Sequence, residues 1–326
     1  MKSSHFDFID IMKAIGIVLI TNSHFKLIYE PVASSIAFGG AAGCAIFFFC
    51  SGFTLIGCEK KHFIKWMLKR IIRIYPAYYF MLAVYYIVEN QKPLFTDIIF
   101  PNQFYWFLQA ILVFYVLFYV VMKILKQYYK WLIPILYIFV GILYLMTNHE
   151  GWDIDYTLSP SHIHWIYYFA IMLLGRYYRE LYTGKVINQQ QYSNGSGGVL
   201  LMIAFISFIV AYSLKFIVNS YPEFLDIQLL FPIFLLLIVI LTYKGSSIIN
   251  ISDNPYFVKV VKVISGLTLE LYLVQFLCIE IAQRFSAIAR IFICLVLIYF
   301  SAFTLNKVSC FFVKYVKKCN PALFVG

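Results

Sequence analysis

The chain has 326 residues, of which 62% are hydrophobic and only 13% are charged, and its mean hydropathy is +0.81. A soluble domain is about 45–50% apolar and about 25% charged, so this composition does not provide a water-facing surface. The net charge of +11 is a common feature of nucleic-acid-binding proteins. Here the basic residues are spread over short connections between apolar segments, which excludes nucleic acid as the expected partner and favours a membrane protein.

Apolar segments of transmembrane length follow one another along the chain. A helix needs about 20 residues to cross a hydrocarbon core of about 30 Å, and about ten segments approach that length. They are 8–26, 36–56, 71–89, 104–122, 131–147, 163–179, 198–217, 227–243, 260–282 and 288–312. The sequence therefore predicts an all-α fold: a polytopic membrane helix bundle of about ten transmembrane helices that forms a single domain over residues 1–326.

Basic connections alternate with neutral or acidic ones, which predicts an even number of spans and two cytoplasmic termini. The short connection with Arg284 and Arg290 is the exception, and the polar stretch near 183–197 is expected to be a loop. The seven cysteines form no C-x-x-C pair, so we expect neither a disulfide framework nor a metal site.

The first apolar segment contains charged residues, although an ionised group at mid-membrane costs at least about 2.5–3.5 kcal/mol. Lys13 and His24 are eleven residues apart, or about three helical turns, so their side chains face the same way about 16 Å apart. Asp10 lies three residues before Lys13 and can neighbour it. These residues form either a structural ion pair with an inert histidine, or a site in which His24 is a general base, since histidine titrates near pH 6.5. The spacing does not decide between the two.

Further motifs follow in order. After K-x10-H come AIFFFCSGFTL (45–55) and FIKWMLKRIIRIYP (63–76), then the weaker matches FYWFLQAILVFY (104–115) and SGLTLELYLVQF (265–276). This ordered set resembles acyltransferase family 3, the bacterial membrane acyltransferases that modify sugars of surface and cell-wall polysaccharides, and it covers nearly the whole chain. Lys13 stands where arginine is commoner in the family, and Gln275 stands where many members have histidine.

The resemblance implies transfer of an acyl group, most commonly acetyl, from acyl-CoA to a hydroxyl of a surface or cell-envelope carbohydrate. The acceptor is free, lipid-linked or polymeric, and the enzyme is expected to be a multi-pass protein of the bacterial cytoplasmic (inner) membrane. Acyl-CoA is a co-substrate rather than a permanently bound cofactor. The expected partners are therefore acyl-CoA, the carbohydrate and membrane lipids.

With that chemistry, His24 is the expected general base, while Lys13, steered by Asp10, contacts the coenzyme or its thioester. Arg70 and Arg73, together with Lys69, are expected to bind the phosphates of the coenzyme. The alternative for these three residues is ordinary cytoplasmic flanking and contact with anionic lipids.

Four further residues are candidate substrate contacts: Trp106, Glu270, Gln275 and Ser51. For Ser51 close helix packing is the competing interpretation, and for Trp106 it is the interfacial aromatic belt. Glu270 is a carboxylate within a predicted span, which makes it a functional candidate, but it also suits a simple ion pair with Lys13 or an arginine.

Two other functions compete with acyl transfer. A multi-pass transporter or flippase of an envelope glycan precursor would line its path with intramembrane charges, yet the sequence shows neither the inverted repeats nor the matched broken helices of that class. A membrane sensor or scaffold would use Asp10, Lys13 and Glu270 only as a structural polar network.

Overall fold

The structure, a computed structural model, describes residues 7–30, 33–88, 90, 94–156, 162–187, 196–248 and 254–321. Within these ranges every regular element is a helix, which confirms the all-α fold class. Helical segments that are long and apolar enough to cross a membrane are Ser34–Thr54, Phe63–Val88, Trp106–Ile124, Lys126–Met146, Ser196–Ser220, Pro222–Ile248 and Ala289–Cys319. The described part of the chain thus has the helices of a polytopic membrane protein.

The remaining predicted spans are helical as well, but several boundaries differ from the prediction, and two of these differences change the organisation of the chain. The predicted span 260–282 is divided into α11 (Pro255–Gly266) and α12 (Thr268–Ala282), because Leu267 between them has non-helical dihedral angles and the glycine before it is a poor helix former. The loop predicted near 183–197 starts too early, since α8 (Ile163–Ile187) continues to residue 187. Residues 188–195 lie outside the described residues.

Contacts between residues divide the chain into two compact units. The first unit contains residues 1–20, 39–56 and 124–266, and the second contains residues 21–38, 57–123 and 267–326. α1 (Asp7–His24) therefore contributes most of its length to the first unit and its last turn to the second. That the chain is a single domain remains a prediction.

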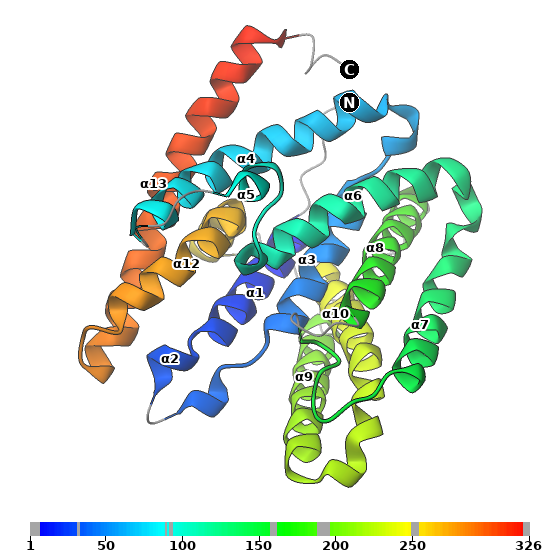
Figure 1. Cartoon of the computed structure of the whole chain (residues 1–326). Coiled ribbons are helices and arrows are strands. Elements are labelled where there is room, and N and C mark those ends of the chain that lie inside the picture. Colours follow the sequence, from blue (N-terminus) through cyan, green and yellow to red (C-terminus); the bar gives the residue numbers. More distant parts are fainter. Residues whose placement is uncertain are drawn as a thin grey trace. The chain divides into compact units, whose positions relative to one another are not determined.

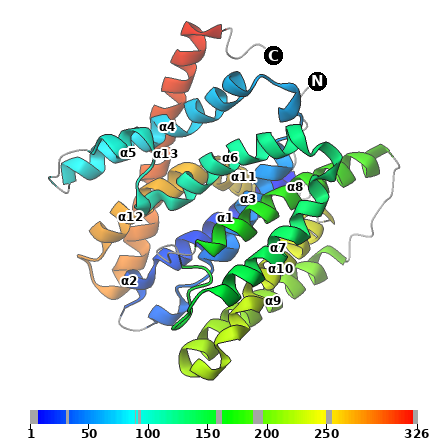
Figure 2. The same cartoon turned by 45° about the vertical axis from the view of Figure 1, so that its right-hand side comes forward.

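In the first unit α3 packs against α8, α7 against α8, and α9 against α10 (Figures 1 and 2). These helices are α3 (Gly40–Thr54), α7 (Tyr129–Met146), α9 (Ser196–Ser220) and α10 (Phe231–Ile248). Two glycines allow α3 and α8 to touch through their backbones, because a Cβ atom on Gly52 would overlap the backbone oxygen of Met172, and one on Gly175 would overlap that of Phe49. This close packing gives Gly52 a structural role.

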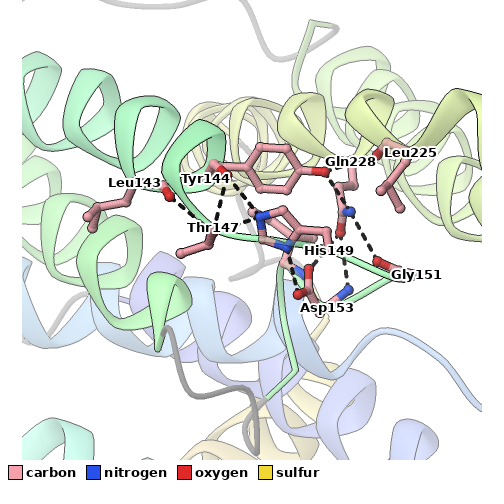
Figure 3. Close-up of polar contacts among 9 residues, drawn as sticks. Leu143, Tyr144, Thr147, His149, Gly151, Asp153, Leu225 and Gln228 are labelled. Atoms are coloured by element: carbon pink, nitrogen blue, oxygen red, sulfur yellow. Dashed lines mark hydrogen bonds and ion pairs between the residues drawn. The ribbon is translucent and has the colours of Figure 1, made fainter.

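The connection after α7 is fastened by the buried side chain of Gln228, which lies in the 3-10 helix Pro222–Leu230 (Figure 3). Its Oε1 atom accepts hydrogen bonds from the backbone N–H groups of Asp153 and Ile154, both at 3.1 Å. Its Nε2 atom donates to the hydroxyl of Tyr144 at 2.8 Å and to the carbonyl of Gly151 at 3.1 Å. The amide therefore satisfies four polar groups at once, as a buried polar side chain must.

His149 completes this network (Figure 3). Its ring stacks on Tyr144 with centroids 3.9 Å apart, Nδ1 lies 2.7 Å from Oδ2 of Asp153, and Nε2 lies 2.9 Å from the carbonyl of Tyr144 and 2.8 Å from Oγ1 of Thr147. The Tyr144 carbonyl belongs to the last turn of α7, so the imidazole caps this helix end. His149 is accordingly explained by structure.

In the second unit α12 lies against α13 (Ala287–Cys319) and α4 (Phe63–Val88) (Figures 1 and 2). Tyrosines of α4 anchor the short helix α5 (Phe95–Ile99). The hydroxyl of Tyr78 donates to the carbonyl of Asp97 at 2.7 Å, and that of Tyr75 donates to the carbonyl of Ile99 at 2.7 Å. The chain then continues into α6 (Trp106–Ile124).

Arg290 in the first turn of α13 explains the basic connection that broke the charge alternation. Its Nη1 atom donates to the carbonyls of Leu27 at 3.1 Å and Glu30 at 3.3 Å. These carbonyls lie at the end of α2 (Lys26–Tyr29), where a helix leaves its carbonyls without intrahelical partners. Arg290 is therefore a helix cap, which gives this charge a structural role.

Candidate active site

His24 is the last residue of α1 and is half-buried within the second unit. Its ring lies edge-to-face against Phe276 of α12, with centroids 4.7 Å apart and an interplanar angle of 68°. Edge-to-face packing of this kind orients an aromatic ring as well as burying it. The imidazole is thus held by α12 rather than being left at a free helix end.

Asn22, two residues before His24, fixes the chain around it. Its Nδ2 atom donates to the carbonyls of Ile36 at 2.8 Å and Phe38 at 2.9 Å, and its Oδ1 atom accepts a hydrogen bond from the hydroxyl of Tyr29 at 2.8 Å. Both ends of the amide are therefore used for local structure. Asn22 positions the end of α1 and is not itself a candidate for chemistry.

An aromatic cluster continues from Phe276. The ring of Tyr105 lies 6.2 Å from Phe276 and 6.2 Å from Tyr272, and Phe107 lies 5.7 Å from Tyr272. Tyr105 also packs edge-to-face against Tyr78 at 5.7 Å. These rings join α4, the turn before α6, α6 itself and α12. They include Phe276, the residue of α12 that contacts His24.

A pocket of about 260 Å³ opens beside this cluster. It is lined by Met81, Tyr85, Val88, Phe104, Tyr105, Phe276, Leu277 and Glu280. Phe276 therefore contacts His24 and also forms part of the pocket wall. The lining combines aromatic rings with one carboxylate. Small-molecule binding sites have this composition, in which mostly apolar walls carry a few polar groups that orient the ligand.

Glu270 lies in the first turn of α12 and is buried. The Nδ2 atom of Asn306 on α13 donates to its Oε1 atom at 2.9 Å, and the guanidinium of Arg73 lies within electrostatic range of the same carboxylate. A buried charge needs such partners. Asn306 is a hydrogen-bond partner of Glu270 that no sequence pattern pointed to, and an ion pair of Glu270 with Lys13 or an arginine stays a prediction.

Gln275 is completely buried on α12. Neither its Oε1 nor its Nε2 atom has a hydrogen-bond partner among the described residues. An unmatched buried amide costs about 1–3 kcal/mol, so the position suits a residue whose partner is a ligand. The unmatched amide supports the expectation that Gln275 contacts substrate.

The three basic candidates lie on α4. Arg70 is half-buried with its guanidinium 5.3 Å from the centroid of Trp66, and its Nε atom is buried without a hydrogen-bond partner in the described ranges. Arg73 is exposed. Lys69 is near Lys61 and Arg70, so like charges gather along this part of the chain.

The structure brings most of the predicted site residues into one unit. Those in the second unit are His24, Lys69, Arg70, Arg73, Trp106, Glu270 and Gln275, and those in the first unit are Asp10, Lys13 and Ser51. Trp106 is half-buried at the start of α6. Asp10 is buried, Lys13 is half-buried, and both lie within electrostatic range of Cys50 on α3.

His164 was not among the candidates named from the sequence, although this residue falls at the start of the predicted span 163–179. His164 lies in the first turn of α8 and is 1% exposed, whereas His24, taken as the histidine well inside a span, is half-buried at a helix end. The H-x-H pattern at 162–164 was a visible signal. Among the described residues no group of three His, Cys, Asp or Glu side chains is placed to hold a metal ion.

Comparison with known families gives one extended match. The family model described as "Acyltransferase domain", Acyl_transf_3, matches residues 6–312. The matched range includes both units. The comparisons with curated proteins and with solved structures gave no match.

Proposed function

The chain belongs to acyltransferase family 3 and is a membrane acyltransferase, and we propose that it moves an acetyl group from acetyl-CoA to a carbohydrate hydroxyl. The carbohydrate would be a surface or cell-envelope glycan or its lipid-linked precursor. The enzyme would act in the cytoplasmic membrane of a bacterium. The observation that carries this proposal is an aromatic pocket with one carboxylate, whose wall includes Phe276, the ring that packs against His24.

The composition of the pocket supports a sugar as the acceptor. Aromatic rings such as Tyr85, Phe104 and Tyr105 offer apolar faces to the C–H groups of a sugar ring, while the carboxylate of Glu280 accepts hydrogen bonds from its hydroxyls. A volume of about 260 Å³ lies just below the range of about 300–1,000 Å³ that is typical of sites for drug-sized ligands. It therefore suits one sugar residue at a time.

His24 supplies the proton acceptor. The imidazole takes the proton of the sugar hydroxyl as the hydroxyl oxygen attacks the thioester carbon, and the tetrahedral intermediate then expels the coenzyme thiolate. The proton held by the imidazole passes to that thiolate, so the ester and the free thiol form together. A positioned general base contributes about 10²–10⁴-fold to such a reaction.

Arg70, assisted by Arg73 and Lys69, would bind the phosphates of the coenzyme. A guanidinium offers paired donors to a phosphate group, and the arrangement of Arg70 over Trp66 limits its side-chain freedom. Lys13, with Asp10, would contact the thioester end of the donor. Gln275 would donate to or accept from the acceptor, and Trp106, Glu270 and Ser51 are further proposed substrate contacts.

The test uses membranes that contain the full-length protein and radiolabelled acetyl-CoA. His24→Gln should lower the yield of acetylated glycan by about 10²–10⁴-fold, whereas the exposed His62→Gln should leave it unchanged. Protein levels in the membranes are measured for both. Equal yields from His24→Gln and the wild type would remove the proposed base.

Donor binding is tested separately through α4. Arg70→Ala should raise the KM for acetyl-CoA at least about tenfold, since charge-assisted hydrogen bonds are worth about 1.5–3 kcal/mol. The matched control is Lys65→Ala, which removes an exposed cation from the same helix. Equal KM values for acetyl-CoA in Arg70→Ala and Lys65→Ala would assign Arg70 to lipid contact instead.

A further inference from the structure

The chain has a second arginine pair with the same spacing as Arg70 and Arg73. Arg176 and Arg179 lie three residues apart on α8 in the first unit. Side chains at this spacing are neighbours on a helix surface. Since Gly175 and Gly52 hold α8 directly against α3, the positions of both arginines are set by backbone contact rather than by flexible side chains.

Arg176 is fixed by an acidic neighbour. Its Nε atom donates to Oε1 of Glu180 at 3.0 Å, and its side chain is only 11% exposed. Lys130 approaches the other oxygen of the same carboxylate at 3.6 Å. The buried Tyr129 has its hydroxyl near both Arg176 and Glu180. One carboxylate is thus shared by two cations.

Arg179 lies on an aromatic surface. Its guanidinium is 5.2 Å from the centroid of Phe53 on α3, and it lies near the rings of Tyr182 and Tyr243. Phe53 is in turn 6.1 Å from Tyr182 and 5.9 Å from Tyr243. Rings around a guanidinium orient it and weaken its contact with water, which strengthens its attraction for an anion.

This cluster of Lys130, Arg176, Arg179 and Glu180 carries three positive charges and one negative charge. Arg176 and Arg179 are close enough to repel one another, and both are half-buried. Ordinary cytoplasmic flanking residues extend their charged groups into the headgroup region, where water surrounds them. Like charges held close together in a half-buried site are stabilised when an anion joins them.

We propose that Arg176 and Arg179 form a second phosphate-binding site, with the hydroxyl of Tyr129 as an additional donor. The spacing and the planar donors of two guanidinium groups match a phosphate better than a lone carboxylate. Phosphate groups reach a membrane protein from two sources, the coenzyme and anionic phospholipid headgroups. The shared chemistry is the phosphate, and the two sources are separated by experiment.

The test uses the purified full-length protein in nanodiscs of phosphatidylcholine. Binding of coenzyme A is measured by calorimetry for the wild type, for Arg176→Gln and Arg179→Gln, and for the control Lys123→Gln, which removes an exposed cation near Tyr119. In parallel, each protein is released from nanodiscs that contain phosphatidylglycerol in a native mass spectrometer, and the lipids that stay bound to the protein are counted. No acceptor is present, so binding is observed whether or not acyl transfer occurs.

At least tenfold weaker coenzyme binding in both glutamine variants, with Lys123→Gln unchanged, assigns the phosphate to the coenzyme. Loss of retained phosphatidylglycerol with unchanged coenzyme binding assigns it to lipid. Arg176→Lys and Arg179→Lys keep the positive charge and serve as conservative variants in case the glutamine variants misfold. They should bind the phosphate ligand with intermediate affinity. Wild-type behaviour of the folded glutamine variants in both measurements would overturn the site.

Discussion

His24 at the end of α1 and Phe276 on α12 are more than 250 residues apart in sequence, yet their rings lie edge-to-face with centroids 4.7 Å apart. Phe276 also lines the pocket that contains Glu280. One aromatic side chain therefore packs against the proposed base and also lines the proposed acceptor pocket. Replacing Phe276 tests how the base is positioned, and replacing Glu280 tests the pocket independently.

Replacing Phe276 should impair the reaction without removing any polar group. Phe276→Leu loses the edge contact, which is worth about 0.5–1.5 kcal/mol, and should lower the rate of acetyl transfer by up to about tenfold. Phe276→Tyr keeps the ring and should retain most of the rate. The measurement is acetyl transfer at saturating acetyl-CoA, and a wild-type rate for Phe276→Leu would show that His24 is positioned by other contacts.

Glu280 should govern acceptor affinity. Glu280→Gln preserves the size of the side chain but removes the charge, and a hydrogen bond to a charged group is worth about 1.5–3 kcal/mol. The KM for the glycan acceptor should therefore rise about tenfold or more, while the KM for acetyl-CoA stays constant. Glu223→Gln, at an exposed carboxylate in the first unit, is the control. A rise in the KM for acetyl-CoA alone would contradict an acceptor pocket.

The sequence predicted the helical class, most spans and the basic segment of α4, because these follow from local hydrophobicity and charge. It also indicated His24, through the position of a histidine in an apolar segment. It did not indicate Phe276, Asn306 or the presence of a pocket. Those depend on which helices meet, and helical periodicity does not encode the partner of a given face.

The arginine pairs illustrate the same limit. Arg70 and Arg176 were both visible as basic residues at the ends of apolar segments, and charge alone placed them with ordinary flanking residues. Their partial burial and their aromatic neighbours distinguish them, and both features arise from packing against other helices. The break at Gly266 was missed for a different reason, since an apolar run continues across it without a change in composition.

The hydrogen bond between Asn306 and Glu270 should contribute to stability. Asn306→Ala leaves the buried carboxylate without its 2.9 Å donor and should lower the free energy of unfolding by about 1–3 kcal/mol. The control Thr304→Val alters an exposed residue two positions earlier on α13 and should change stability little. Thermal unfolding in detergent measures both.

The same pair separates structure from chemistry. In a double-mutant cycle, Glu270→Gln combined with Asn306→Ala should cost less than the sum of the single changes, because the pair interacts directly. Additive costs would indicate that Glu270 is stabilised mainly by its surroundings, including Arg73. A loss of acetyl transfer in Glu270→Gln without loss of stability would support its proposed role as a substrate contact.

The close contact between α3 and α8 predicts that a substitution at Gly52 destabilises the protein, and Gly141 provides a control. Gly52→Ala adds a methyl group that overlaps the backbone oxygen of Met172, and overpacking of this kind costs about 1–3 kcal/mol. Gly141→Ala on α7 adds the same group where no atom lies within 4 Å, and it should be neutral or stabilising because alanine favours helix over glycine by about 1 kcal/mol. Thermal unfolding should rank Gly141→Ala at or above the wild type and Gly52→Ala well below it.

Because α8 carries Arg176 and Arg179, folded Gly52→Ala should also bind phosphate more weakly. Unchanged thermal unfolding of Gly52→Ala would show that the backbones of α3 and α8 are not in contact.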